Sequence, residues 1–236
     1  MADFPAPQPH GTLEELFPDI FLVRGEMKMG ALVAIGRSMI VLREGTSLTL
    51  VNSIRLSEAG EKSLCALGEV KHLVRLGGYH GLDDPYYRAR FSPTYWSPVA
   101  ADKGAERLVD GAKGPIARST IFAFQRPPRG EGALLIEQSG GNLLITCDST
   151  QTWADTRHCS AVGSLMVRAM GFLSPAKIGP IWLKETTGGQ PAAMWPDFER
   201  LLALDFEHLA SGHGSLLRGG AKAAVTRSCE RTLGPR

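Results

Sequence analysis

Short apolar runs separated by glycine-containing breaks dominate the first half of the chain. Runs of this length that are rich in Val, Ile and Leu predict β-strands. The predicted strands cover residues 20–27, 31–44, 47–53 and 70–76. A helix is predicted from Ser57 to Leu67, because Ser57 can cap its first turn and Gly68 can end it in a left-handed conformation.

The second half begins with strands and then becomes helical. Strands are predicted at 121–125, 133–138 and 143–148, and the Ser-Gly-Gly-Asn segment at 139–142 fits a hairpin turn between the last two. Helices are predicted at 84–91, 160–171, 195–204 and 219–232. Residues 92–120 have no regular pattern. The segment 177–184 is expected to be a short strand or a loop. Strands followed by helices in each half predict a layered α/β protein with antiparallel hairpins. The Pro-rich residues 1–12 are expected to be an extended arm, and residues 13–236 a single domain.

Composition and charge narrow the class of protein. The net charge is +2 and the Lys and Arg residues are scattered, so we expect no nucleic-acid partner. The apolar runs are far shorter than the roughly 20 residues of a membrane span, and the N-terminus lacks the basic and apolar regions of a signal peptide. Four widely spaced cysteines without a Cys-x-x-Cys pair suggest reduced thiols in the cytoplasm. A small-molecule substrate or ligand is the expected partner, and the sequence is compatible with a homodimer.

Three apolar segments end in side chains that could carry out chemistry. His80, Asp83 and Asp84 follow the strand at 70–76, Asp148 follows the strand at 143–148, and His213 follows an apolar segment near residue 209. Imidazole and carboxylate groups at strand exits are typical of α/β active sites. Each also has a purely structural alternative, such as an Asx-turn at Asp148 or a helix cap at Asp83.

Taken together, these segments resemble the metallo-β-lactamase superfamily. Its main motif, His-x-His-x-Asp-His, aligns with residues 80–85, so that His80 matches the first His and Asp84 the Asp. Leu82 and Pro85 stand where the family has its other histidines. Within the superfamily the chain looks closest to an uncharacterised branch with an incomplete metal motif, because residues 67–80 follow that branch's Leu-Gly-x-Val-x-His-Leu-Val…His pattern.

Later segments extend the resemblance. Asp148 matches the family's metal-bridging Asp, and His213 matches the final ligand in its Gly-His-Gly turn. Arg129 is the counterpart of a missing His ligand, and Asn52 replaces a structural Asp. The resemblance implies a four-layer αββα sandwich of two mixed β-sheets and a metal-dependent hydrolase.

Carried over residue by residue, the resemblance implies a reduced, mononuclear site. Asp84, Asp148 and His213 would bind one divalent zinc, iron or manganese ion with an open position for water, and His80 would be a fourth ligand or a general base. The implied reaction is hydrolysis of an ester, lactone, amide or phosphoester.

A second hypothesis gives Arg129 the central role. A guanidinium cannot bind a cation but pairs well with carboxylates, so an inward-pointing Arg129 would replace the metal charge beside Asp148 and Asp84. On this hypothesis the protein binds no metal and is a binding or assembly protein built on a degenerate site. The two hypotheses make opposite predictions for the direction of the Arg129 side chain.

Overall fold

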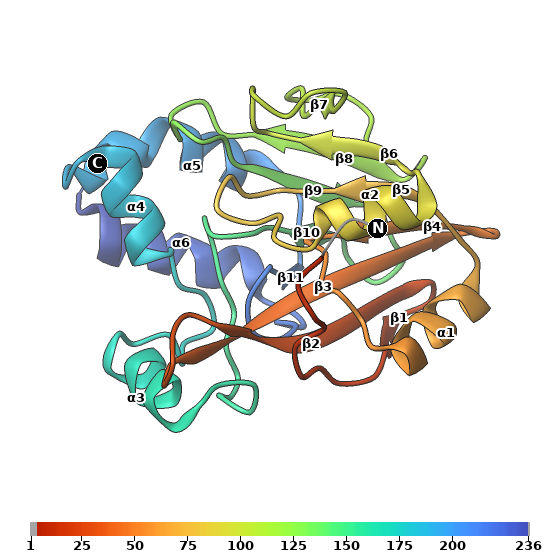
Figure 1. Ribbon diagram of the computed structural model, residues 1–236. Helices are drawn as coiled ribbons and strands as arrows, with labels where there is room; N and C mark the ends of the chain where they lie inside the picture. Colours follow the sequence, from red (N-terminus) through yellow and green to blue (C-terminus); the bar gives the residue numbers. More distant parts are fainter. Residues whose placement is uncertain (1–3, 236) are drawn as a thin grey trace.

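Two β-sheets packed face to face form the centre of the computed structural model, which describes residues 4–235 (Figure 1). The larger sheet has seven strands in the order of the sequence, β1 to β7. Their bounds are Glu14–Phe17, Ile20–Lys28, Ala34–Glu44, Ser47–Val51, Glu69–Val74, Thr94–Ser97 and Glu106–Arg107. The strands pair antiparallel from β1 to β4 and parallel from β4 to β7, so the sheet is mixed.

The second sheet has four strands in the order β11-β10-β9-β8. Their bounds are Ser119–Ala123 for β8, Gly132–Ile136 for β9, Leu143–Ile145 for β10 and His208–Ala210 for β11. β8, β9 and β10 are antiparallel neighbours, whereas β11 lies parallel to β10. The parallel pair places the segments that follow β10 and β11 at the same end of the sheet.

The alternation of side chains along β2 explains how the larger sheet packs on both faces. Successive strand residues point to opposite faces. Ile20 and Leu22 therefore pack against the second sheet, while Phe21 and Val23 pack beneath helices. Since Ile20 and Val23 are fully buried, truncation of either to Ala would cost about 2–5 kcal/mol of the free energy of unfolding.

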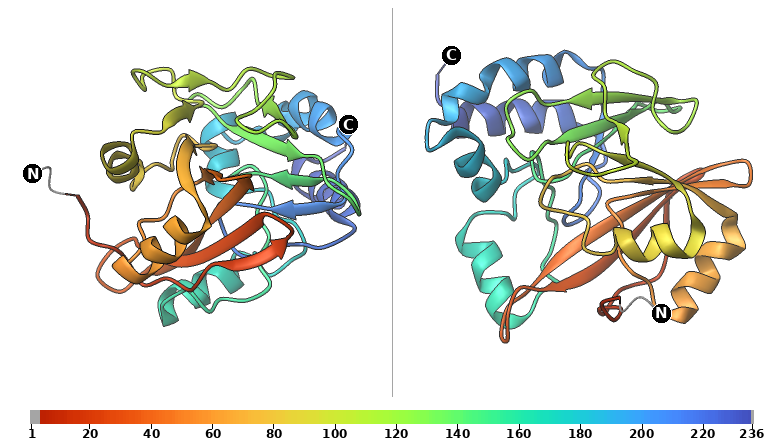
Figure 2. Two further views of the ribbon diagram at one scale, coloured as in Figure 1. Left: turned by 90° about the vertical axis from the view of Figure 1, so that its right-hand side faces the viewer. Right: turned by 45° about the horizontal axis from the view of Figure 1, so that its top comes forward.

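Helices cover the outer face of each sheet, as the two views in Figure 2 show. α1 and α2 pack on the seven-stranded sheet, and α4, α5 and α6 pack on the four-stranded sheet. α3 lies beside the tip of the β2–β3 hairpin, where Ser160 Oγ donates a hydrogen bond to the Leu32 carbonyl. The helix bounds are Glu58–Leu67, Asp84–Phe91, Ala161–Ala169, Pro180–Thr187, Trp195–Ala203 and Ala221–Leu233, with a 3-10 turn at Pro191–Met194. The predicted four-layer αββα sandwich of two mixed sheets is confirmed.

The helix predicted after Ser57 is present, but Gly68 ends it for a different reason than predicted. Ser57 Oγ accepts the Gly60 N–H at 3.3 Å, as expected of an N-cap. Gly68 has φ 155° and ψ −163°, which is not the left-handed helical conformation. A Cβ there would lie 2.2 Å from the Thr46 carbonyl oxygen, so the close approach of two backbones requires glycine.

Three other segments differ from the sequence predictions. Part of 177–184 belongs to helix α4, whose Pro180 occupies the first turn that proline favours. The irregular stretch at 92–120 contains the short strands β6 and β7, of which β7 forms the edge of the sheet. Part of the predicted arm at 1–12 lies against β2, because Gly11 N–H donates to the Arg24 carbonyl at 2.8 Å; residues 1–3 lie outside the described part. Within residues 4–235 we find no helix that is long and apolar enough to cross a membrane.

Candidate functional site

Three loops at one edge of the sandwich bring His80, Asp148 and His213 together. His80 follows β5 of the larger sheet, while Asp148 and His213 follow β10 and β11 of the smaller one. Because β10 and β11 are parallel, their following loops leave the same end of the sheet. The site therefore lies where the two sheets meet, as predicted for strand-exit side chains.

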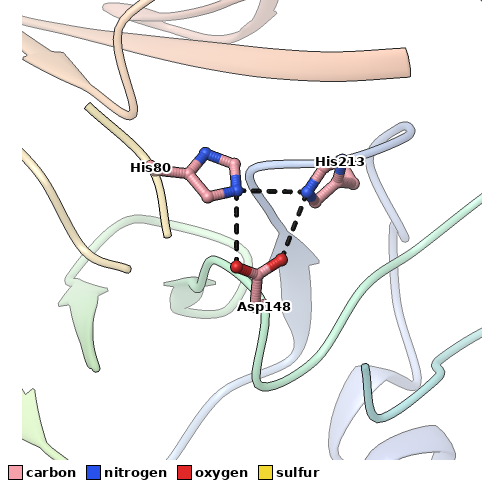
Figure 3. Close-up of side chains that lie close together, drawn as sticks. All are labelled: His80, Asp148 and His213. Carbon is pink, nitrogen blue, oxygen red and sulfur yellow. Dashed lines mark hydrogen bonds and ion pairs between the residues drawn. The ribbon is translucent and has the colours of Figure 1, made fainter. Parts of the chain in front are cut away.

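The three side chains converge on one point (Figure 3). His80 Nε2 lies 3.1 Å from His213 Nε2 and 3.5 Å from an Asp148 carboxylate oxygen. His213 Nε2 lies 3.2 Å from the other carboxylate oxygen. The side chains of His80, Asp148 and His213 are 14%, 13% and 7% exposed, so the cluster is largely shielded from water.

The cluster is electrostatically coupled. Burial opposes ionisation of Asp148, but the charges and hydrogen bonds of His80 and His213 outweigh it and hold the Asp148 pKa well below its usual range. Burial likewise opposes protonation of His213, yet the hydrogen bond and charge of Asp148 raise the His213 pKa. Asp148 is therefore a carboxylate at neutral pH, and it stabilises positive charge placed beside it.

Supporting contacts orient His213 and Asp148. His213 Nδ1 lies 2.7 Å from the Gly36 carbonyl oxygen, which leaves Nε2 facing the cluster. Gln151 Nε2 donates to Asp148 Oδ1 at 3.2 Å and Gln151 Oε1 accepts from the Trp153 indole N–H. The Trp153 ring is stacked on the His213 imidazole at 5.9 Å and 16°. Neither Gln151 nor Trp153 was predicted from the sequence, although both lie within five residues of Asp148.

The glycines of the Gly-His-Gly turn are required by close contacts. A Cβ on Gly212 would lie 3.2 Å from His80 Cε1 and 3.0 Å from Cys147 Sγ. Gly214 has φ +83°, and a Cβ there would lie 1.8 Å from the Thr152 carbonyl oxygen. The turn therefore fits against the segments that carry the other two members of the cluster.

Asp84, the fourth predicted ligand, lies outside this cluster. Its carboxylate accepts hydrogen bonds from Ser53 Oγ at 2.6 Å and from Tyr95 Oη at 2.9 Å. Burial raises its pKa. Asp83 is also buried and forms an ion pair with Arg37 at 2.7 Å. Both aspartates therefore hold the loop after β5 in place, and the structure brings together three of the four predicted ligands.

In the described part of the chain, Arg129 forms no ion pair with the aspartates of the predicted site. Its side chain is exposed, and the guanidinium carbon lies 4.9 Å from the centroid of the Tyr79 ring. None of the ion pairs formed within residues 4–235 joins Arg129 to Asp148 or Asp84. The basic side chains in contact with Asp148 are those of His80 and His213, so the hypothesis that Arg129 replaces a metal charge has no contact to support it.

Glu131 is a buried acid that was not predicted from the sequence. It is 1% exposed, Oε1 accepts the Ser149 N–H at 2.8 Å, and Oε2 has no hydrogen-bond partner in the described chain. Burial, and then the charge of Asp148, raise its pKa well above the usual value. The only signal in the sequence was a charged residue between two glycines at the start of an apolar run. Glu131 holds the loop that carries Asp148.

Asn52, in place of the family's structural Asp, links three strands. Its amide nitrogen donates to the Thr146 carbonyl at 3.1 Å, and its Oδ1 accepts the Leu76 N–H at 3.1 Å. It has a φ of 56°, a left-handed conformation that Asn tolerates better than most residues. Asn52 therefore ties the end of β4 to the strand exits that deliver His80 and Asp148.

The donor set and its spacing fit one divalent metal ion. A tetrahedral ion with bonds of about 2.0–2.2 Å places its ligand atoms about 3.3–3.6 Å apart. The two imidazole Nε2 atoms lie 3.1 Å apart and face different oxygens of Asp148, at 3.2 and 3.5 Å. With one ligand atom taken from each residue, the three atoms lie within 4.8 Å of one another. Two imidazoles and one carboxylate, with the His213 ring held by a backbone carbonyl, match the ligand types and outer contacts of zinc and iron sites.

Comparison with solved structures shows the same architecture. A metallo-β-lactamase from Erythrobacter litoralis has a TM-score of 0.60 and 12% identity, with coverage of 94% of this chain and 89% of that one. The mono-zinc form of the metallo-β-lactamase FIM-1 from Pseudomonas aeruginosa has a TM-score of 0.61 and 12% identity, with coverage of 98% and 99%. The flavodiiron protein from Giardia intestinalis has a TM-score of 0.62 and 15% identity, with coverage of 94% of this chain and 59% of that one.

These likenesses show that the chain has the metallo-β-lactamase fold. No protein-family model matches the sequence, and no curated protein matches it. At identities of 10–15%, the likeness is one of fold, not of activity.

Proposed function

We propose that this protein is a metal-dependent hydrolase with a single divalent metal ion held by His80, Asp148 and His213. The observation that carries the proposal is the convergence of three ligand atoms, all within 4.8 Å of one another. A bound metal would supply a water of lowered pKa and polarise the substrate carbonyl or phosphoryl group. Three protein ligands leave an open coordination position, which is the arrangement of catalytic rather than structural sites.

The residues of the chain have separate roles in this proposal. Asp148 supplies the one negative charge in the ligand set, and Gln151 fixes its orientation. His213 is held by the Gly36 carbonyl and the Trp153 ring, so it is pre-organised before the metal binds. His80 and Asp148 are exposed to nearly the same extent, at 14% and 13% of their side chains, so both are accessible to a substrate. Asp84 is assigned no ligand role because its oxygens are engaged by Ser53 and Tyr95.

The substrates proposed are small molecules with an ester, lactone, amide or phosphoester bond. The test is turnover of such a panel by protein loaded in turn with zinc, iron(II) and manganese(II). Activity that needs one of these metals and is lost in His213→Gln supports the proposal. His158→Gln is the matched control, because His158 is a half-buried loop histidine outside the cluster. Equal activity in wild type and His213→Gln would contradict it.

A further inference from the structure

A groove of about 550 Å³ lies beside the proposed metal cluster. Its volume falls in the range of small-molecule sites. Its walls come from the loop after β5, the loop after β6 and the β8–β9 loop. The lining residues are Gly78, Pro98, Val99, Ala100, Ala101, Phe124, Pro127, Pro128, Arg129 and Gly130. All but one of these are apolar or glycine.

Arg129 is the one charged side chain in this lining. Its guanidinium rests on the face of the Tyr79 ring, which leaves the N–H groups at its edge available. No ion pair within residues 4–235 uses it. A guanidinium fork of this kind binds a carboxylate through two parallel hydrogen bonds.

A second arginine adds positive charge at the same wall. Arg107 donates hydrogen bonds to the carbonyls of Val99 at 2.8 Å and Pro98 at 3.4 Å. No Asp or Glu lines the groove. The groove therefore combines apolar side chains with polar surface from its backbone and Arg129, and it has positive charge at its edge.

The groove and the metal cluster share one chain segment, residues 78–80. Gly78 lines the groove, and its N–H donates to the Gly130 carbonyl at 3.0 Å. Tyr79 lies beneath the Arg129 guanidinium, and His80 points to Asp148 (Figure 3). Residues 77–80 form a turn closed by the His80 N–H, which donates to the Gly77 carbonyl at 3.0 Å. Because Gly78 and His80 are two residues apart, their Cα atoms can be at most about 7 Å apart. A small molecule can therefore reach both.

We infer that the substrate of this site carries a carboxylate on a compact apolar group, which binds in the groove with its carboxylate on Arg129. The inference rests on the proposed hydrolase function, since it assigns the non-reacting part of that substrate. A phosphate ester of a nucleotide fits less well, because a phosphate dianion needs more charged donors than the one guanidinium in the lining. The apolar walls would bury the body of the acid, and Arg129 would fix its direction.

The test compares an acid with its neutral isostere. Binding of hexanoate and hexanamide is measured by calorimetry on chelator-treated protein, so that no metal competes for the carboxylate. We expect Arg129→Gln to weaken hexanoate binding about tenfold and leave hexanamide binding unchanged. Arg129→Lys should fall between, because it keeps the charge but loses the fork. Arg126→Gln is the matched control, an exposed arginine in the same loop that does not line the groove.

A second variant tests the apolar wall. Ala101 is exposed at the groove edge, so Ala101→Trp should fill the groove without disturbing the core and weaken both ligands. Zinc uptake, measured on every variant, should stay at the wild-type level.

The outcomes separate the inference from the proposed function. Hexanoate binding that is equal in wild type and Arg129→Gln overturns the inference. Binding that appears only with zinc and is lost in Asp148→Ala also overturns it, since the carboxylate would then sit on the metal. Arg129-dependent binding in a protein that takes up no metal supports the anion site and overturns the hydrolase proposal.

Discussion

Replacement of Asp148 by Asn tests the electrostatic coupling of the cluster. Asn keeps the shape of the side chain and its contact with Gln151 but removes the negative charge. In metal-free protein, the charge-assisted contact from His213 Nε2 at 3.2 Å is then lost. Such a hydrogen bond contributes about 1.5–3 kcal/mol when buried, where salt screens it little. For a chain of this length, about 2 kcal/mol corresponds to roughly 4–8 °C in Tm.

The sign of the pH dependence makes this prediction specific. Asp148 raises the His213 pKa above its ordinary 6.5 in the folded protein. His213 therefore adds stability that is fully present below that ordinary value and is lost as pH rises through the folded pKa. In Asp148→Asn this contribution disappears, so the variant should be less stable than wild type by about 2 kcal/mol near pH 6 and by less near pH 9.5.

The assay is thermal or urea unfolding of both proteins in chelator across this pH range. Gln151→Leu is a useful control, because it removes a hydrogen bond to the same carboxylate without removing charge. An Asp148→Asn loss that is the same at every pH, or absent at the acidic end, would refute the coupling of Asp148 with His213.

Three further predictions follow from single contacts. Gly212→Ala places a methyl 3.2 Å from His80 Cε1, and should weaken zinc binding about 10- to 100-fold in a competition titration; unchanged affinity would contradict the packing of this turn against His80. Glu131 has a raised pKa in the folded protein, so its ionisation at high pH destabilises the fold. Glu131→Gln should therefore be more stable than wild type by about 1–3 kcal/mol in alkaline buffer with chelator, and equally stable near pH 4. A stability difference that does not change with pH would contradict this prediction. Burial opposes ionisation of Asp155, but Arg157 and Arg24 hold its pKa at about 2. In urea unfolding, Asp155→Asn should lower the free energy of unfolding by about 0.5–1 kcal/mol above pH 4, and by progressively less as the pH falls toward 2. The expected loss is small because the ion pair is partly exposed to solvent.

The sequence predicted the layers of the fold because its strands carry strong local signals. β2 and β3 have buried residues on both faces, and α1 begins at a capping serine. α4 was missed because its start has no side-chain cap and its apolar residues resemble a short strand. β6 and β7 were missed because they are only four and two residues long, which is too short for a strand pattern in the sequence.

The sequence predicts the position of those site residues that directly follow a strand. His80, Asp148 and His213 follow strands whose order brings them together. The direction of the Arg129 side chain could not be predicted from the sequence. Arg129 lies in a loop, and its guanidinium is positioned by contact with the Tyr79 ring rather than by a regular backbone conformation.

Buried partners were equally hidden in the sequence. Asp84 matches a ligand position by alignment, but Ser53 and Tyr95, which are distant in sequence, engage its oxygens. Glu131 is buried only because the loop of Asp148 folds over it. Side-chain partners of this kind depend on tertiary packing, which no local pattern in one sequence encodes.

The metal content of the untagged protein tests the central claim most directly. Elemental analysis after loading with zinc, iron or manganese and removal of excess should give about one ion per chain in wild type, as one three-ligand site requires. Asp148→Ala should lose it, while His158→Gln should keep it. No bound metal after loading with excess cation, or equal metal in wild type and Asp148→Ala, would contradict a metal site at His80, Asp148 and His213.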